Sequence, residues 1–303
     1  MSCFRPLAAY RSSGGEVWIG ENPTKDGYKL ELPCGRCVGC KLDARRAWSI
    51  RIMHEAQLYD RNWFATLTYA DEHLPSSRSL EYRHFQLFMK RLRKRLRGVS
   101  EGPEGGRPLR FFCAGEYGGR TSRPHFHAIL FNLSTGDEQE YVNGSFRSAM
   151  LEELWLKGTV QLDSVTPQSA AYVAGYSQKK VHGPRAALYY EDVIDVKTGE
   201  VTRRRPEFVA MSLKPGIGTW WFRKYGKDLF PHDFAVSEGK RWKVPRFYWN
   251  KFRLEADGAQ VEELEYGRFL RAQASAGEST PERRAVREEV ALRRQEMFQE
   301  RGL

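Results

Sequence analysis

Two histidines in a short apolar segment are the residues of this chain best suited to chemistry. Residues 123–131 read Arg-Pro-His-Phe-His-Ala-Ile-Leu-Phe, and a short apolar and aromatic run of this kind is typical of a buried β-strand. Because side chains alternate across a strand, His125 and His127 leave the same face. Two imidazoles on one face can form half of a metal site, although they can equally be polar residues on the wetter face of a half-buried strand.

A glutamate just upstream can complete this site. Residues 110–119 read as a strand that runs into a glycine-rich turn and returns directly into the histidine strand. Such a hairpin would set Glu116 beside His125 and His127. A carboxylate with two histidines leaves coordination positions open, which suits a divalent ion, Mg²⁺ or Mn²⁺, that must also hold a substrate oxygen. A solvated charge near a turn is the commoner fate of a glutamate.

Two tyrosines and two lysines lie on a segment that predicts a helix. Pro167 is suited to the first turn, and the residues after it can continue as a helix. Tyr172 and Tyr176 are four residues apart, so they share one face at about 6 Å from each other. Lys179 and Lys180 follow within the next turn. Two hydroxyls and an ammonium on one helical face are unusual in a core, although an amphipathic helix with buried tyrosines and exposed lysines has the same spacing.

Four of the five cysteines are expected to form a structural metal site. Cys34, Cys37 and Cys40 make a Cys-x2-Cys-x2-Cys run, and three closely spaced thiols suit zinc, which takes four ligands in a structural site. Cys3 is the best candidate for the fourth ligand, because an N-terminal segment folds back easily. Cys113 is the rival, but its parity on the predicted strand points it into the core. An iron–sulfur cluster and reduced loop thiols are the alternatives.

The composition favours a polyanionic partner. The 303 residues carry 49 Lys+Arg against 38 Asp+Glu, a net charge of +11, which points to nucleic acid before anionic membranes. Aromatic residues make up 13% of the chain, which favours single strands, where bases stack on rings. A hydrophobic content of 41% excludes global disorder. Neither a bilayer-spanning run nor a signal peptide is evident, so we expect a soluble protein.

The order of the predicted elements indicates the fold class. Strands and helices alternate as strand, helix, strand, strand, helix, strand and then the tyrosine helix. We expect an α+β protein with a ferredoxin-like (RRM-like) antiparallel sheet, helices on one face, and the other face left for the histidines and nucleic acid. The predicted segments are strands near 63–69, 110–117, 123–131 and 158–165, with helices near 41–59, 79–97 and 145–156.

Basic residues interleaved with aromatic ones form the candidate nucleic-acid surface. The helix near 79–97 has an apolar side and a dense basic side, as expected of a helix that packs on a sheet and offers its other face to an anion. Two later stretches mix bases and aromatics, which suits stacked bases and phosphates as well as a small aromatic core with snorkelling bases. The candidate residues are Arg91, Lys94, Arg95, Arg123, Lys214, Trp220, Arg241 and Trp242.

The chain divides into four predicted segments. They are a Cys-rich segment with a basic helix (1–60), a catalytic core (61–182), a basic and aromatic accessory region (183–255) and a charged helical tail (256–303). The thin apolar stripe of the tail predicts a loosely attached arm. No Gly-x4-Gly-Lys-Ser/Thr motif occurs, so an ATP-driven helicase of the P-loop type is excluded.

Together these stretches resemble the HUH endonucleases, named after the His-hydrophobic-His strand, which include rolling-circle replication initiators, relaxases and related transposases. The closer resemblance is to replication initiation proteins of small single-stranded DNA phages, the microviruses and especially the gokushovirus group. The resemblance covers roughly residues 1–255. The matching segments are Cys34-Gly35-Arg36-Cys37-Val38-Gly39-Cys40, Phe64-Ala65-Thr66-Leu67-Thr68-Tyr69, Gly115-Glu116-Tyr117-Gly118, Pro124-His125-Phe126-His127, Tyr172-Val173-Ala174-Gly175-Tyr176-Ser177-Gln178-Lys179-Lys180 and Met211-Ser212-Leu213-Lys214-Pro215-Gly216-Ile217-Gly218.

The resemblance implies a metal-dependent tyrosine transesterification on single-stranded DNA. A tyrosine would attack a phosphodiester at a replication origin, release a 3′-hydroxyl and keep the 5′-phosphate as a covalent adduct. A two-tyrosine initiator would use Tyr172 and Tyr176 in turn, with Lys179 or, less directly, Lys180 stabilising the transition-state charge. The Tyr-x2-Lys spacing favours Tyr176 as the first nucleophile.

Such an initiator would work in the cytoplasm of a bacterial host with the host helicase and polymerase, and it would need neither a membrane nor a small-molecule substrate. Three alternatives stay open. The chain can be a zinc-stabilised single-strand binding module without catalysis, a nuclease that uses water, or an HUH transposase that acts on the hairpin ends of mobile elements.

Overall fold

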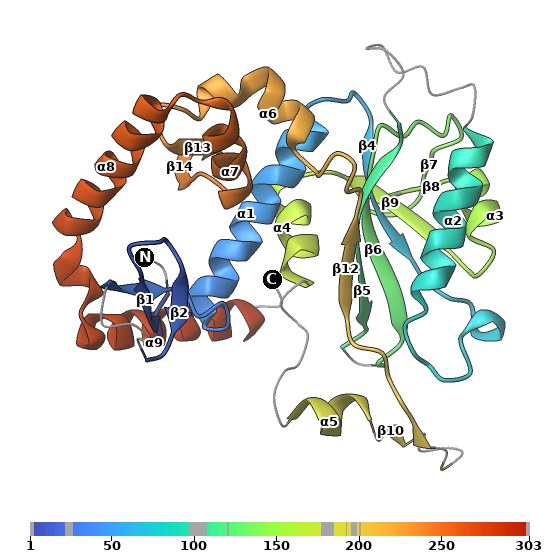
Figure 1. The fold of residues 1–303 in the computed structure, drawn as a ribbon. Coiled ribbons are helices and arrows are strands. Elements are labelled where there is room, and N and C mark those ends of the chain that lie inside the picture. The colour runs from blue at the N-terminus through green and yellow to red at the C-terminus, as the bar shows by residue number, and fades with distance from the viewer. Residues whose placement is uncertain are drawn as a thin grey trace. The chain divides into compact units, whose positions relative to one another are not determined.

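A computed structural model describes residues 3–21, 27–96, 108–119, 121–176, 185–191, 193–194, 199 and 201–300 (Figure 1). The chain divides into two compact units: Met1–Arg46 with Asn250–Leu303, and Ala47–Trp249. The four-part division of the sequence stays a prediction, and the structure adds that most of the first segment shares a unit with the tail.

The larger unit is built on a seven-stranded antiparallel sheet with the order β12-β5-β6-β4-β9-β8-β7. The predicted α+β class with an antiparallel sheet is therefore confirmed. Around its centre the chain runs β4-α2-β5-β6-α3-β9, which is the order of a split βαβ unit. The strands are β4 (Asn62–Leu67), β5 (Arg110–Tyr117), β6 (Pro124–Phe131), β7 (Gln139–Glu140), β8 (Phe146–Arg147), β9 (Val160–Ser164) and β12 (Phe208–Met211).

One face of this sheet is covered by α2 (Tyr82–Arg95) and α3 (Ala149–Trp155). The two helices pack on the side that Phe126, Ala128 and Leu130 share, which makes this the larger apolar core. Figure 1 shows both helices on the same side of the sheet. The helix predicted near 79–97 thus packs its apolar side as expected, with buried Phe85, Phe88, Met89 and Leu92.

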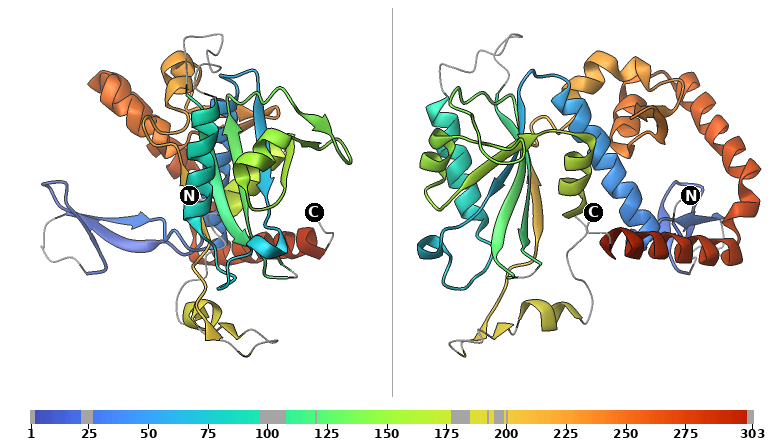
Figure 2. Two further views of the ribbon diagram at one scale, coloured as in Figure 1. Left: turned by 90° about the vertical axis from the view of Figure 1, so that its right-hand side faces the viewer. Right: turned by 180° about the vertical axis from the view of Figure 1, so that it is seen from behind.

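The other face is covered as well, so the expectation of helices on one face only was wrong. Residues of α4 (Pro167–Tyr176) and of the end of α1 (Val38–Ala56) pack on Ile129 and Phe131. In Figure 2 the view from behind shows α2 and α4 on opposite sides of the sheet. The physical reason lies in β6, because the face that begins with His125 and His127 continues with these two apolar residues, whose burial requires a cover.

A buried ion pair joins α1, β5 and the loop before α6 (Thr219–Tyr225). Glu55 is fully buried, and its Oε1 accepts a hydrogen bond from Arg110 Nε at 2.7 Å. Its Oε2 accepts from the Gly218 N–H at 2.6 Å, and Arg110 Nη2 donates to the Pro215 carbonyl at 2.7 Å. A buried charge is tolerated only with such partners. Gly218 has φ +84° and a Cβ there would collide with Tyr248, so this loop position requires glycine.

Aromatic residues of the accessory region form a core, which decides between the two interpretations of their pattern for the buried ones. His54 stacks on Trp221 with ring centres 3.5 Å apart, and its Nδ1 lies 3.1 Å from Tyr248 Oη. Arg51 lies between the rings of Trp48 and Phe247 at 3.9 and 3.7 Å. The other elements here are η2 (Gly226–Asp228), β13 (Phe234–Ser237), β14 (Lys240–Lys243) and α7 (Arg246–Glu255).

The smaller unit combines a three-stranded sheet with the helical tail. Its sheet has the order β2-β1-β3. Arg284 pairs with Glu31 of β3, and Arg5 Nε lies 2.9 Å from Glu288 Oε2, so ion pairs join the tail to the N-terminal segment. The elements are β1 (Leu7–Arg11), β2 (Val17–Ile19), β3 (Tyr28–Leu32), α8 (Gly258–Ala274), η3 (Ala276–Ser279) and α9 (Pro281–Glu300).

The remaining short elements of the larger unit are η1 (Asp71–His73), α5 (Arg185–Tyr190), β10 (Val193–Ile194) and β11 (Val201–Thr202). The pairing of β10 with β11 agrees with the hairpin predicted in this region. Within the described part of the chain, none of the helices combines the length and the apolar character that crossing a membrane requires.

Acid should destabilise the protein through His54. Burial lowers the pKa of His54 to about 3, well below the value near 6.5 expected in the unfolded chain. The unfolded state therefore binds a proton first as the pH falls, and the stability due to neutral His54 is lost below about pH 6.5. Between about pH 7.5 and about pH 5 this loss should reach about 2 kcal/mol. Urea unfolding of wild type and of His54→Gln at both pH values measures it, and an equal acid sensitivity of the two proteins would contradict the prediction.

Candidate active site

The hairpin of β5 and β6 brings the predicted metal-binding residues together. Antiparallel pairing sets Glu116 directly opposite His125. Glu116 Oε1 lies 2.8 Å from His125 Nε2 and 3.1 Å from His127 Nε2, and the two Nε2 atoms are 3.1 Å apart. Three potential ligand atoms from three residues thus converge on one point, as the sequence predicted.

The second ring nitrogen of each histidine has a partner of its own. His125 Nδ1 lies 3.1 Å from the Arg123 carbonyl oxygen, which can only accept a hydrogen bond. The Nδ1–H therefore donates, and Nε2 keeps its lone pair toward Glu116. His127 Nδ1 lies 3.1 Å from Thr66 Oγ1 of β4. The imidazoles are thereby held with their Nε2 atoms directed into the cluster.

The donor set fits a divalent cation. Glu116 is 5% exposed and His127 is 6% exposed, and a buried carboxylate needs a positive partner or hydrogen-bond donors to offset its lost hydration. One carboxylate oxygen and two imidazole nitrogens suit Mn²⁺ well and Mg²⁺ acceptably, and they are too few to fill an octahedral shell. Positions for substrate oxygens or water therefore stay available.

The predicted tyrosines lie on this cluster. The Tyr176 ring stacks on the His127 ring with centres 5.3 Å apart and an angle of 4°. Tyr172 meets both rings edge-on, at 5.3 Å from His127 and 4.8 Å from Tyr176. The shared helical face is confirmed. Tyr172 is 46% exposed and Tyr176 only 2%, so the two phenols differ strongly in their access to solvent.

Burial raises the pKa of Tyr176, and the neighbouring Tyr172 hydroxyl and Glu116 carboxylate raise it further. All three effects disfavour the phenolate, so a cation or a base must assist this tyrosine before it can act as a nucleophile. Lys179 and Lys180, the predicted sources of such assistance, lie outside the described residues.

The predicted nucleic-acid residues are scattered rather than gathered at this site. Arg91 donates to the carbonyl oxygens of Leu154 and Trp155, so it caps α3 on the sheet face opposite the histidines. Exposed Lys94 and Arg95 follow it on α2. The reason is the packing of α2, whose apolar side binds the face that points away from His125 and His127.

The later basic and aromatic candidates have local partners. Trp220 lies beneath the Arg110 guanidinium, with Cζ 4.6 Å from the ring centre. Arg241 lies 4.6 Å above the Phe234 ring, and Trp242 Nε1 donates to the Ser237 carbonyl at 3.4 Å. Lys214 is exposed on the loop before α6. Arg123 is the one candidate next to the cluster, two residues before His125.

Sequence reasoning missed how Phe64 and Thr66 contribute to the site. The Phe64 ring is parallel to that of His127 at 5.4 Å, and its edge contacts Tyr172 at 6.2 Å. The alternation of β4 showed which of its residues share a face. Which strand β4 pairs with, and in which register, carried no signal in the sequence.

The four predicted cysteines form a second cluster, in the smaller unit. Cys34 Sγ lies 4.0 Å from Cys40 Sγ, and Cys37 Sγ lies 3.8 Å from Cys3 Sγ. All four sulfurs are within 4.8 Å of one another. Tetrahedral coordination with Zn–S bonds of about 2.3 Å separates the sulfurs by about 3.8 Å, so the donor set fits a structural zinc ion.

Backbone amides support thiolates in this cluster. Burial raises the pKa of Cys37, but the amide N–H groups of Cys40 and Phe4, with the thiols of Cys40 and Cys34, outweigh it and lower this pKa to about 6. Cys113 is fully buried in the core of the larger unit, so its predicted inward orientation is confirmed and Cys3 is the fourth member.

Metal analysis tests the cysteine cluster. We expect about one zinc ion per chain in protein purified without chelator, because the four sulfurs match a tetrahedral structural site. Cys3→Ser should lose most of this zinc, measured by mass spectrometry and by release to a coloured chelator. Cys113→Ser should keep it. Equal zinc in both variants would exclude the assignment of the fourth ligand.

Comparison with known proteins places this geometry in a family. Residues 62–181, from β4 to just beyond α4, match the family model for the replication-associated protein ORF2. The chain is 35% identical over 262 residues to replication-associated protein VP4 of Bdellovibrio phage phiMH2K, covering 84% of this chain and 78% of the relative. It is 28% identical over 280 residues to replication-associated protein ORF2 of Spiroplasma virus 4, covering 84% and 81%.

A third relative, replication-associated protein ORF4 of Chlamydia phage 1, is 27% identical over 253 residues, covering 80% of this chain and 59% of the relative. No solved structure matches the chain significantly. The resemblance to phage replication proteins is confirmed, and the chain belongs to the family of phage replication-associated proteins.

Proposed function

We propose that this protein is an HUH-type endonuclease and strand transferase that nicks single-stranded DNA at a viral replication origin and rejoins it. The proposal rests above all on one observation, the packing of Tyr172 and Tyr176 against His127 within the Glu116, His125 and His127 cluster. A carboxylate–histidine cluster alone suits many hydrolases. Two phenols directly beside it suit a reaction that keeps the cleaved strand attached to the protein.

The chain's own groups would carry out the following reaction. The oxygen of a tyrosine hydroxyl forms a bond to phosphorus, and the bond from phosphorus to the 3′-oxygen breaks. The phenol releases its proton to solvent, and the departing 3′-oxygen takes one up, so a free 3′-hydroxyl and a 5′-phosphotyrosine result. The new ester conserves the energy of the old one, and the reverse attack reseals the strand.

Glu116, His125 and His127 would hold the divalent ion, Mg²⁺ or Mn²⁺. When bound, the ion supplies charge neutralisation of a nonbridging oxygen and polarisation of the phosphorus. The Arg123 carbonyl and Thr66 fix the orientation of the imidazoles before substrate arrives. Such preorganisation limits the reorganisation needed during the reaction.

Two tyrosines allow a second transfer after a round of synthesis, when one phenol still carries the 5′ end. Tyr172 is exposed and needs no displacement to meet a strand, whereas Tyr176 is shielded by its neighbours. This difference favours Tyr172 for the first attack, whereas the Tyr-x2-Lys spacing favours Tyr176. Lys179 and Lys180 stay candidates for stabilising the transition state.

The family and the named relatives, all from phages and viruses of bacteria, support a role in replication inside a bacterial host. A single-stranded origin would be the substrate. The sequence contains no P-loop motif, so the host helicase would unwind the duplex ahead of the host polymerase. The cysteine cluster would bind zinc as a structural element.

A covalent-capture gel tests the function. Labelled single-stranded fragments tiling the DNA that encodes this chain are mixed with protein and Mg²⁺ or Mn²⁺, then denatured. We expect a labelled adduct that survives denaturant, disappears with EDTA, and is lost in the Tyr172→Phe/Tyr176→Phe double variant, because no phenol remains at the cluster. The single variants rank the tyrosines by the fraction of adduct that each retains.

Tyr266→Phe, an exposed tyrosine of α8, is the matched control and should form adduct like wild type. Cleavage without an adduct would identify water as the nucleophile. Binding to every fragment with neither cleavage nor adduct would favour a single-strand binding module, and adducts confined to hairpin ends would favour a transposase.

A further inference from the structure

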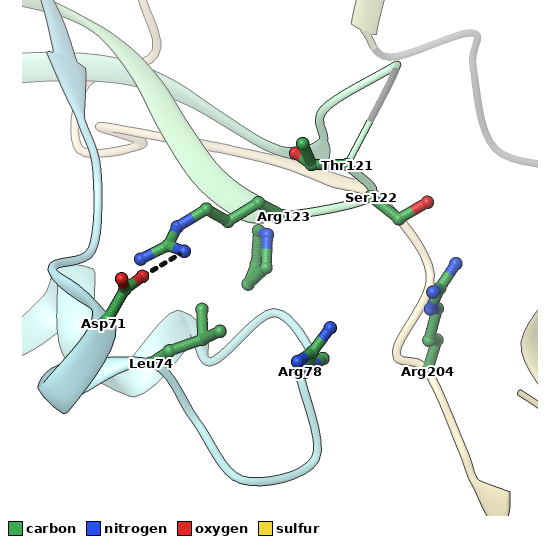
Figure 3. Close-up of a pocket in the computed structure, with 8 residues that line it drawn as sticks. Asp71, Leu74, Arg78, Thr121, Ser122, Arg123 and Arg204 are labelled. Carbon is green, nitrogen blue, oxygen red and sulfur yellow. Dashed lines mark hydrogen bonds and ion pairs between the residues drawn. The ribbon is translucent and has the colours of Figure 1, made fainter. Parts of the chain in front are cut away.

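Three arginines from distant parts of the sequence line one pocket at the start of β6. This arginine pocket belongs to the larger unit and has a volume of about 400 Å³ (Figure 3). Arg78 comes from the loop before α2, Arg123 from the residue before β6, and Arg204 from the segment before β12. The other lining residues are Asp71, Leu74, Thr121, Ser122 and Pro124. Three guanidinium groups thus share the lining with one carboxylate, which leaves a surplus of positive charge.

Arg123 is held in place by its neighbours. Its Nη1 donates to Asp71 Oδ1 at 2.6 Å, and its Nη2 donates to the Tyr69 carbonyl oxygen at 2.7 Å. The Asp71 side chain is 91% exposed, so water screens this pair strongly. Figure 3 shows Arg123 turned toward Asp71, with Arg78 and Arg204 farther along the pocket. Its guanidinium is therefore positioned while much of its charge stays available.

Arg204 carries a buried donor that lacks an acceptor. Its Nε is inaccessible to solvent, and within the described ranges no oxygen accepts a hydrogen bond from it. Its Cζ lies 5.4 Å from the centre of the Tyr117 ring, so the guanidinium is packed on an aromatic side chain. Burying a donor without an acceptor is costly. An anion in the pocket would supply the acceptor.

The backbone is strained at two positions of the lining. Arg78 has φ +48° and Ser122 has φ +50°, both in the left-handed region that residues other than glycine seldom adopt. Such strain persists where the surrounding structure imposes it, and it gathers at ligand-binding sites. Here it brings one arginine and one hydroxyl to the rim of the same pocket.

The arginine pocket adjoins the metal-binding cluster. The carbonyl oxygen of Arg123 accepts the hydrogen bond from His125 Nδ1 at 3.1 Å. Two residues of extended backbone span about 7 Å. A strand whose phosphate lies at Glu116, His125 and His127 would therefore bring a neighbouring part of its backbone to the pocket.

We propose that the arginine pocket binds a backbone phosphate of the DNA strand, next to the phosphate that is cleaved. The identity of the strand rests on the function proposed above, whereas the pocket itself is argued from its own geometry. Guanidinium groups are the side chains best matched to phosphate oxygens. Leu74 and Pro124 are the apolar members of the lining, so the chemistry favours a phosphate over a base. The pocket would position the strand, since phosphate contacts set register and orientation.

Salt-dependent binding tests this proposal in the full chain, with EDTA present so that no cleavage interferes. The probe is a fluorescent oligodeoxythymidine of about 16 nucleotides. Arg78→Gln and Arg204→Gln should each weaken binding about tenfold at low salt. Each should also reduce the slope of log K against log salt by about 0.7, the value for one lost phosphate contact on a single strand. Arg204→Lys should keep the slope but lose part of the affinity, because it keeps the charge without the planar fork.

Arg83→Gln is the matched control, since Arg83 is an exposed arginine of α2 outside the pocket and its loss changes the net charge equally. Affinity and slope should stay near wild type in this variant. An unchanged slope in both pocket variants would overturn the proposal. Thermal melts establish that each variant is folded.

An abasic probe of the same length separates a phosphate site from a base site. A pocket that holds a phosphate should show the same fold-loss on this probe in Arg78→Gln and Arg204→Gln. A loss that disappears on the abasic probe would show that the pocket holds a base and would overturn the proposal.

The two proposals can fail independently. An absent adduct in the capture gel with an altered salt slope would reject the nicking function and leave the pocket standing as a phosphate site. A normal adduct with an unchanged slope in both variants would reject the pocket alone.

Discussion

The register between β5 and β6 is the constraint on which the rest of the site depends. Pairing Glu116 with His125 sets a carboxylate and two imidazoles on one face. A slip by a single residue would turn Glu116 into the core on the other face and bring Tyr117 toward the histidines. Apolar residues on both faces of the hairpin oppose such a slip, since Cys113 pairs with Ala128 on one face and Phe112 with Ile129 on the other. The same packing that stabilises the sheet therefore defines the metal ligands.

The site lies where β6 changes character along its histidine-bearing face. His125 and His127 begin this face, and Ile129 and Phe131 continue it. The apolar part requires a cover, and α4 provides it with Ala170, Val173 and Ala174. Because the tyrosines lie on that same helix, the burial that holds α4 on the sheet also holds the phenols against His127. Glu55 and Arg110 add a polar anchor at the other end of β5, where a charge pair without water between its members ties α1 to the sheet.

Much of the site could be predicted because its signals are local. Alternation along β6, the four-residue spacing of the tyrosines and the spacing of three cysteines each refer to a few neighbouring residues. What was missed or wrong depends on contacts between distant segments. The second layer of helices follows from where α1 and α4 pack, the stacking of His54 on Trp221 joins residues far apart in sequence, and Arg78, Arg123 and Arg204 meet only through the folded chain. Helix ends also shifted by a few residues, as for α1, which ends at Ala56 instead of near residue 59.

The smaller unit is assembled from both ends of the chain, and this has a consequence for synthesis on the ribosome. The cysteine cluster and β1–β3 emerge first, whereas Arg284 and Glu288, which pair with Glu31 and Arg5, emerge among the last residues. All residues of the Glu116 cluster and both tyrosines are translated in between. A nascent chain thus has every residue of its tyrosine site outside the tunnel before the partners that close its N-terminal unit have been made.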